Sequence, residues 1–271
     1  MNKTVLITGT STGFGKLTAK KFQAEGWNVA ATMRSPENEN ELNQLENVLV
    51  TRLDVTDQAS ITKAVQESIE KFGTIDVVVN NAGYGAMGPM EAATNDQIRR
   101  QMDVNFFGVI DVMKAVLPIM REKRSGTIVN VTSMGGRMAF PFLSMYHASK
   151  YAVEGLTESM QYELKPLGIN LKLIEPGAFR TEFGAGSADL LDTSNFEDYQ
   201  EAHAKFMEAI VGGATFGDAQ VVAEAIYDAT TDNSNQLRYL VGEDAKQLVG
   251  AKSQMEEGQF TQMLTEQMGL N

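Results

Sequence analysis

The sequence predicts an α/β fold of the Rossmann type, a doubly wound, mostly parallel seven-stranded sheet with helices on both faces. Short runs of β-branched and aliphatic residues recur along the chain, and helical stretches separate them. The first run, residues 5–7, passes directly into a glycine-rich segment and then a helix, as in nucleotide-binding folds. Because strands that alternate with helices form parallel sheets, we expect a ligand site at the carboxyl ends of the strands.

Six of the expected strands cover residues 5–7, 28–32, 48–53, 75–79, 126–133 and 169–175, and the seventh precedes the segment that begins at Gly242. Helical patterns lie between them, over residues 16–25, up to Phe72, over 95–120 and over 145–167. Thr56 or Asp57 is placed to cap the second helix, and Gly73 to end it.

Asn105 stands in the middle of the 95–120 helical pattern. Asparagine has a poor helix propensity and competes for backbone hydrogen bonds. It is therefore either an interior hydrogen-bonding device or a functional distortion of the helix. Without other evidence, we favour the first.

The composition limits the possible functions. We expect a single domain over residues 1–271, and a net charge of −12 argues against nucleic acid and against an anionic membrane surface as partners. The chain has no cysteine, and its two histidines, His147 and His203, lack ligand spacing, so no metal site is expected. With no signal peptide and no apolar run of about 18 residues, a cytoplasmic location is expected.

The glycine-rich segment after the first strand predicts a nucleotide-binding turn. Gly9 permits a tight turn, Gly13 lets the backbone approach a pyrophosphate, and Gly15 lets the helix pack close to the strand. The amino terminus of the helix then meets the phosphates. The alternative is a glycine-rich turn without a ligand.

The second and third strands end in residues that bear on the nucleotide. Arg34 follows the second strand where dinucleotide folds often carry an acid, and Met33 is neutral. A guanidinium suits a 2′-phosphate, so the pattern favours NADP(H), with NAD(H) possible; a solvated arginine is the alternative. Asp54 precedes the expected N-cap of the next helix. We therefore expect that helix capping does not explain both Asp54 and Asp57.

Tyr146 and Lys150 lie four residues apart near the start of a predicted helix and therefore share one face. A phenol has a pKa of about 10, and a fixed ammonium favours its ionised form. The pair predicts a tuned acid/base group, although a packed ring beside a solvated charge is the commoner meaning of this spacing.

In order and spacing, these motifs resemble the short-chain dehydrogenase/reductase family over about residues 3–182, and more loosely beyond. The family's glycine motif matches Thr8 to Gly15, and its next loop matches Asn80-Asn81-Ala82-Gly83. The catalytic tetrad of the family matches Asn105, Ser133, Tyr146 and Lys150, and Pro176-Gly177 with Thr181 matches its nicotinamide-side segment. Within the family, Ser11–Gly15 and 237–242 are similar to a branch with hydroxysteroid- and retinol-type enzymes.

The resemblance implies an oxidoreductase that interconverts a ketone or aldehyde and an alcohol. It implies that Tyr146 is the general acid/base, that Ser133 binds the substrate oxygen, and that Lys150 binds the nicotinamide ribose and lowers the pKa of Tyr146. Asn105 would hold a proton path through its backbone and a water. The implied cofactor-binding residues are Gly9, Ser11, Thr12, Gly13, Phe14, Gly15, Arg34, Asp54, Val55, Asn81, Ala82, Gly83, Tyr146, Lys150, Pro176, Gly177, Phe179 and Thr181.

The chain departs from the family pattern in two places. Many NADP-preferring members carry a basic residue within the glycine motif, whereas Ser11 and Thr12 are neutral and could only donate hydrogen bonds to a phosphate. Many tetrameric members end with a glycine-rich segment, whereas this chain continues with an extension over 243–271. A homodimer through the helices that hold Asn105 and Tyr146 is therefore favoured over a tetramer.

Residues 182–216 lie where the family keeps its variable substrate lid, and Gly184, Gly186, Gly212 and Gly213 are candidate hinges. Apolar residues of this region face either a substrate or a protein core: Phe183, Leu190, Leu191, Phe196, Tyr199, Phe206 and Met207. Met138, Phe140 and Phe142 are better candidates for the substrate pocket, so a largely apolar small-molecule substrate is expected.

Three other functions are weighed against the leading one. They are a nucleotide-sensing protein without turnover, an NAD-dependent alcohol dehydrogenase, and an enzyme of this fold acting on nucleotide sugars. The complete tetrad argues against the first, and the short chain argues against the last.

Overall fold

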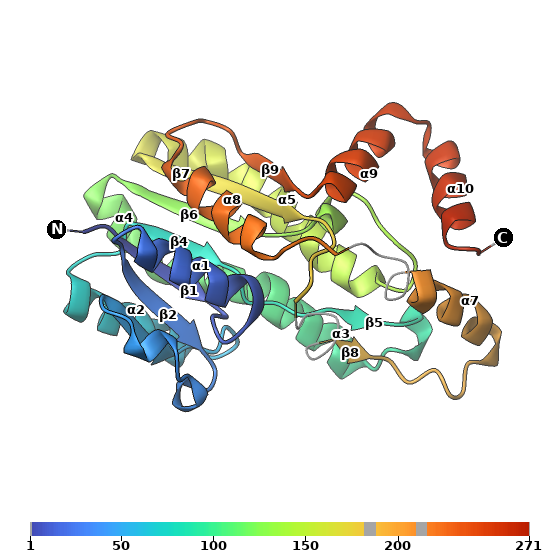
Figure 1. Ribbon diagram of the computed structural model, residues 1–271, viewed down its shortest axis with the longest axis horizontal. Coiled ribbons are helices and arrows are strands. Elements are labelled where there is room, and N and C mark those ends of the chain that lie inside the picture. Colours follow the sequence, from blue (N-terminus) through green and yellow to red (C-terminus); the bar gives the residue numbers. More distant parts are fainter. Residues whose placement is uncertain (1, 182–187, 210–215, 271) are drawn as a thin grey trace.

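Seven parallel strands form the central sheet of the computed structural model, which describes residues 2–181, 188–209 and 216–270 (Figure 1). Their order is β3-β2-β1-β4-β6-β7-β9. The strands are β1 (Thr4–Thr8), β2 (Asn28–Met33), β3 (Val48–Arg52), β4 (Val77–Asn80), β6 (Gly126–Val131), β7 (Ile169–Pro176) and β9 (Arg238–Val241). The predicted doubly wound sheet is confirmed, and the order reverses between β1 and β4, where such sheets bind ligands.

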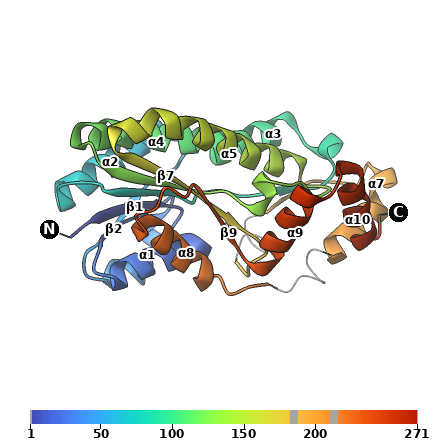
Figure 2. The ribbon, with the colours of Figure 1, turned by 90° about the horizontal axis from the view of Figure 1, so that it is seen from above.

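Helices cover both faces of the sheet, as Figure 2 shows from above. One face carries α1 (Gly13–Ala24) and α8 (Gln220–Thr231). The other carries α2 (Gln58–Phe72), α4 (Gly108–Lys123) and α5 (Ser144–Leu164). The doubly wound prediction therefore holds for both layers.

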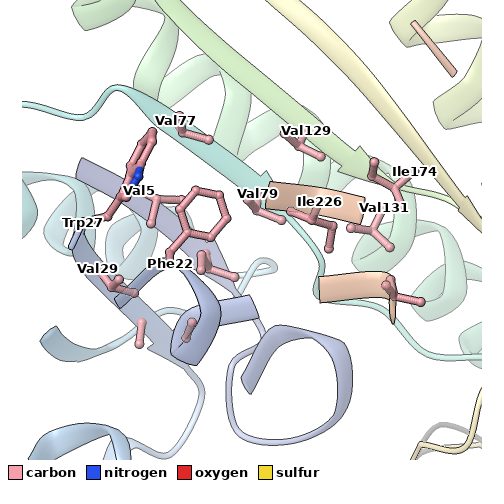
Figure 3. Packing of buried hydrophobic residues seen from close by; sticks show 14 of the residues in the cluster. Val5, Phe22, Trp27, Val29, Val77, Val79, Val129, Val131, Ile174 and Ile226 are labelled. Atoms are coloured by element: carbon pink, nitrogen blue, oxygen red, sulfur yellow. The ribbon is translucent and has the colours of Figure 1, made fainter. Parts of the chain in front are cut away.

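Alternation along the strands sends side chains into two separate cores. Val5 of β1 packs with Phe22 of α1 and Ile226 of α8 (Figure 3), and Ile7 belongs to the same cluster. Leu6 packs toward α2 and α4 on the opposite face. A strand covered on both faces has no solvent side, which explains why residues 5–7 of β1 are all apolar.

Two predicted helix boundaries are confirmed. The Asp57 carboxylate caps α2 by accepting from the backbone nitrogens of Ala59 and Ser60. Gly73 ends the same helix with a φ of 84°, a left-handed conformation that glycine adopts without strain.

The predicted helix over 95–120 is broken into three parts. It begins with α3 (Asn95–Met102), passes through a π-helical turn, η4 (Asp103–Phe107), and continues as α4. Asn105 lies inside the π turn. It is thus both an interior hydrogen-bonding residue and part of a helix distortion, the two readings that the sequence left open.

The carboxyl edge of the sheet is extended by smaller elements (Figures 1 and 2). These are the two-stranded pair β5 (Ala86–Met87) and β8 (Asp189–Leu190), with α7 (Glu197–Met207), α9 (Glu243–Gln254) and α10 (Glu257–Gln267). The candidate hinges Gly184, Gly186, Gly212 and Gly213, with Phe183, lie outside the described residues. Within the described part of the chain, no helix is both long and apolar enough to cross a membrane.

Candidate active site

The glycine loop has the backbone shape that a phosphate-binding turn needs. Gly9 and Gly13 have φ values of 71° and 55°, in the left-handed region. A Cβ added to Gly15 would overlap the carbonyl oxygen of Gly9, so only glycine fits there. The Thr12 hydroxyl makes no capping bond to α1, and the first turn of that helix has no acid. An anion therefore fits at this helix end.

Asn81 ties the loop after β4 to the glycine loop. Its Nδ2 donates to the carbonyl oxygens of Thr8 and Gly9, at 2.9 and 3.0 Å. The Thr8 hydroxyl in turn accepts from the backbone nitrogens of Asn81 and Ala82, both at 3.0 Å. The Asn81 side chain thus holds two cofactor-side loops together, and this is a structural role that the sequence did not reveal.

Ser133, Tyr146 and Lys150 come together at the ends of β6 and α5. A side-chain hydrogen bond joins Ser133 and Tyr146, and the Ser133 hydroxyl also accepts from the backbone nitrogen of Gly135 at 3.0 Å. Lys150 is buried, and its Nζ lies 5.7 Å from the centre of the Tyr146 ring. The structure therefore brings the predicted acid/base pair and the predicted substrate-binding hydroxyl into one place.

Burial is the main influence on the pKa values of Tyr146 and Lys150. Burial raises the pKa of Tyr146 to about 12, and only the Ser133 bond opposes it. Burial lowers the pKa of Lys150 to about 8, against the pull of Glu154. The lowering of the Tyr146 pKa by Lys150, which the resemblance implies with the help of a cationic nicotinamide, stays a prediction. Near neutral pH the phenol carries its proton.

Asn105 anchors the loop after β4 through its side chain. Its Oδ1 accepts from the Tyr84 nitrogen at 3.1 Å, and its Nδ2 donates to the Tyr84 oxygen at 2.8 Å and to Ser149 Oγ at 3.1 Å. The buried Gln101 supports the same loop, since its Nε2 donates to the Tyr84 oxygen at 2.8 Å. Gln101 was missed because nothing in the polar sequence of α3 marks it as buried.

On the adenosine side, Arg34 is exposed at the end of β2. It forms no hydrogen bond or ion pair with any residue that the structure describes. Asp54 lies half-buried beyond the adjacent β3, and its Oδ1 accepts from the nitrogen and hydroxyl of Thr56, at 3.0 and 2.8 Å. Asp57 alone caps the helix, as expected, and Asp54 instead closes the turn before it. Val55 is buried beneath Gly108.

The segment after β7 reaches back to the glycine loop. A Cβ on Gly13 would lie 3.5 Å from Thr181, and Phe14 and Phe179 meet edge to face at 5.9 Å. Pro176 accepts from the Ser133 hydroxyl at 3.4 Å, so this segment spans from the glycine loop to the acid/base group.

The apolar candidates divide into two clusters. Phe140, Phe142, Phe206 and Met207 pack around Tyr146 with Leu143, Met87, Met268 and Leu270. Met138 instead belongs to the cluster beneath α9 and α10, so its prediction as a pocket residue is wrong. Leu191 is buried, Leu190 is 59% exposed, and Phe196 contacts the ring of Tyr199, whose hydroxyl donates to Glu91.

Two buried carboxylates behind the site were also missed. Glu154 and Glu175 lie beside each other, and both contact Arg238, at 3.0 and 3.4 Å. Burial and the neighbouring Glu154 raise the pKa of Glu175 to about 7. Among the described residues, no histidine, cysteine or carboxylate cluster of three could hold a metal ion.

Known proteins share both the sequence pattern and the fold. The family described as short chain dehydrogenase matches residues 3–189. An uncharacterised oxidoreductase of Schizosaccharomyces pombe is 40% identical over 88% of this chain and 100% of its own length. The 3-ketodihydrosphingosine reductase of Bacteroides thetaiotaomicron is 41% identical over 76% of this chain and 75% of its own length.

Two solved structures are similar over most of their length. A short-chain dehydrogenase from Streptomyces avermitilis has a TM-score of 0.87 and 32% identity, and the match covers 100% of this chain and 99% of that one. ElxO, solved with NADP bound, has a TM-score of 0.75 and 28% identity, with 92% and 99% covered. Together with the Ser133–Tyr146–Lys150 geometry, the match over residues 3–189 shows that the chain belongs to the short-chain dehydrogenase/reductase family of oxidoreductases.

Proposed function

We propose that the protein is an NADP(H)-dependent oxidoreductase that reduces a largely apolar ketone or aldehyde to the alcohol, with Tyr146 as the general acid. The observation that carries this proposal is the group formed by Ser133, Tyr146 and Lys150, in which burial keeps the phenol protonated. A protonated acid is the form that carbonyl reduction requires, because the product oxygen must gain a proton.

Ser133, Tyr146 and Lys150 each have a separate role in the proposed reaction. Ser133 Oγ is held by the Gly135 nitrogen, from which it accepts, and its single proton turns from the Pro176 carbonyl oxygen to the substrate oxygen. Tyr146 gives its proton to the same oxygen as negative charge develops there. Lys150 supplies a fixed positive charge beside the ring, and its Nζ is held by the Val131 carbonyl at 3.0 Å. Preorganised charges of this kind stabilise the transition state more than the substrate.

The cofactor would lie along the carboxyl edge of the sheet. Gly9, Gly13 and the amino terminus of α1 would hold the pyrophosphate, and Phe179 and Thr181 the carboxamide. When bound, the nicotinamide supplies the hydride. Support for NADP(H) comes from the NADP that ElxO binds and from the guanidinium of Arg34, which is exposed and pairs with none of the residues that the structure describes. NAD(H) is the alternative cofactor.

The substrate class follows from the side chains beside Tyr146. The cluster that includes it is aromatic and aliphatic, and Ala188 and Phe206, from the region proposed as the lid, belong to the same cluster. An apolar ketone gains most from such surroundings. The resemblance to a reductase named for 3-ketodihydrosphingosine supports the same class.

The test is a panel of ketones, aldehydes and alcohols assayed with NADPH, NADP, NADH and NAD, by the absorbance of the reduced nicotinamide. We expect ketone reduction with NADPH to give the highest kcat/KM. Arg34→Ala should raise the KM for NADPH by roughly 10- to 150-fold and leave that for NADH nearly unchanged. Equal kcat/KM values for both reduced cofactors would contradict the preference. Binding of NADPH without turnover of any compound would favour a nucleotide sensor instead.

We further propose a homodimer through η4, α4 and α5. Phe107 is 50% exposed and Tyr162 is 76% exposed, and both large rings lie on these elements. Aromatic residues are enriched at interfaces between chains, which supports the proposal. Light scattering coupled to gel filtration should give a dimer mass, and the double variant Phe107→Asp, Tyr162→Asp a monomer.

A further inference from the structure

His147 follows Tyr146 on α5, but its buried ring contacts the loop over residues 135–140. Its Nδ1 lies 2.8 Å from the Gly135 carbonyl oxygen, and its Nε2 lies 2.9 Å from the Phe140 backbone nitrogen. A carbonyl oxygen can only accept, and an amide N–H can only donate. The ring must therefore be neutral, with its proton on Nδ1 and with Nε2 as the acceptor.

These two hydrogen bonds hold both ends of the loop. The Gly135 nitrogen donates to Ser133 Oγ at 3.0 Å, so the His147–Gly135 bond also supports the substrate-binding hydroxyl. A Cβ on Gly135 would lie 2.7 Å from Nδ1, which shows how closely loop and ring fit. At the other end, Phe140 packs both with the cluster around Tyr146 and with the cluster beneath α9 and α10.

The charged surroundings disfavour a protonated ring. Burial lowers the pKa of His147 below its ordinary 6.5, and Lys252 of α9 lowers it further, while the Gly135 bond opposes them. On the same helix, the centre of the Tyr146 ring lies 5.6 Å from the centre of the His147 ring. The charged side chain of the loop, Arg137, pairs with Glu175 at 3.2 Å and offers the ring no negative charge.

We propose that His147 is a positioning residue for the substrate: its neutral Nδ1–H form holds the 135–140 loop, and protonation of Nε2 releases Phe140 and opens the substrate side. A protonated Nε2 would be a donor facing the Phe140 N–H, while Nδ1–H would still donate to Gly135. Protonation of the ring therefore breaks only the hydrogen bond at the Phe140 end of the 135–140 loop. As pH falls through the lowered pKa, the KM for a ketone rises, while NADPH binding and kcat change little.

Two substitutions separate the two hydrogen bonds. In His147→Gln, the side-chain oxygen replaces Nε2 and can accept from Phe140 without titrating. In His147→Asn, the side-chain nitrogen replaces Nδ1 and can donate to Gly135, but nothing reaches Phe140. The Asn variant should raise the KM about tenfold at neutral pH, the size expected for one unmade hydrogen bond. The Gln variant should stay within about threefold of wild type and lose the rise at low pH.

The first measurement needs no substrate. The chain has two histidines, so a long-range ¹⁵N–¹H spectrum of the full protein shows two imidazoles, and His203→Gln assigns them. We expect the Nδ1–H tautomer for His147; the Nε2–H tautomer would overturn the proposal. Backbone hydrogen exchange over residues 135–140 should then be faster in the Asn variant than in the Gln variant, and equal rates would also overturn it.

The kinetic measurement uses the panel ketone with the highest kcat/KM, and in this part the inference rests on the proposed function. An Asn variant with an unchanged KM, or a Gln variant that keeps the rise at low pH, would refute the positioning role. If the wild type turned over no ketone, the proposed function would fail, and the tautomer and exchange results would still decide whether His147 holds the loop.

Discussion

Replacing Asn105 by alanine tests whether its side chain holds the loop after β4. Asn105 is 2% exposed, and its amide makes three hydrogen bonds. After the replacement, the Tyr84 oxygen keeps its bond from Gln101, and Ser149 keeps its own bond to the Tyr146 carbonyl at 2.7 Å. The Tyr84 N–H is the group left without an acceptor.

The expected loss of stability follows from the hydrogen bonds that the replacement removes. An unpaired, partly buried N–H costs about 1–3 kcal/mol, and the lost volume adds about 1 kcal/mol, so the free energy of unfolding should fall by about 2–4 kcal/mol. Because the Tyr84 loop adjoins Gly83 and Lys150, kcat should also fall.

The assay is urea denaturation together with steady-state kinetics. Asn170→Ala is the matched control, since Asn170 is exposed and its side chain bonds to no described residue. That control should change stability by less than about 0.5 kcal/mol. If Asn105→Ala behaved like the control in both measurements, the assigned role of the side chain would be wrong.

Three other substitutions test the site and its charges. Gly15→Ala should weaken NADPH binding more than about tenfold in a fluorescence titration, because the added Cβ overlaps the Gly9 carbonyl oxygen. Burial lowers the pKa of Lys150 to about 8, so kcat/KM for NADPH should fall above pH 8, and Lys150→Arg should shift that limb upward. Burial beside Glu154 raises the pKa of Glu175 from 4.5 to about 7, so the folded state retains a proton that the unfolded state loses. Stability should therefore fall as pH rises between these values, and thermal melts of Glu175→Gln should lack that fall.

The sequence predicted the sheet well because its strands are buried on both faces. Runs such as 5–7 and 77–79 can hardly form anything else between helical patterns. The topology indicated that a site lies at the strand ends, and the family resemblance named its residues. Asp57 and Gly73 were predictable because a cap and a left-handed C-terminus each require particular residue types.

Other features depend on contacts that a local pattern does not carry. The π turn at 103–107 differs from an α-helix by one residue in its hydrogen-bond spacing, and that shift leaves no mark in the order of apolar residues. In the sequence Glu175 is not distinguished from other strand residues, because its arginine partners come from distant segments. The raised pKa of Tyr146 was not predictable from the sequence, because burial of the ring is a tertiary property.

The most direct test of the proposed function is the turnover of Tyr146→Phe beside the wild type. The substitution removes the transferable proton and leaves the ring, so we expect NADPH oxidation with the best panel ketone to fall by roughly 10²–10⁴-fold, with NADPH affinity nearly unchanged. A Phe variant that keeps more than about a tenth of the wild-type rate would show that Tyr146 is not the acid.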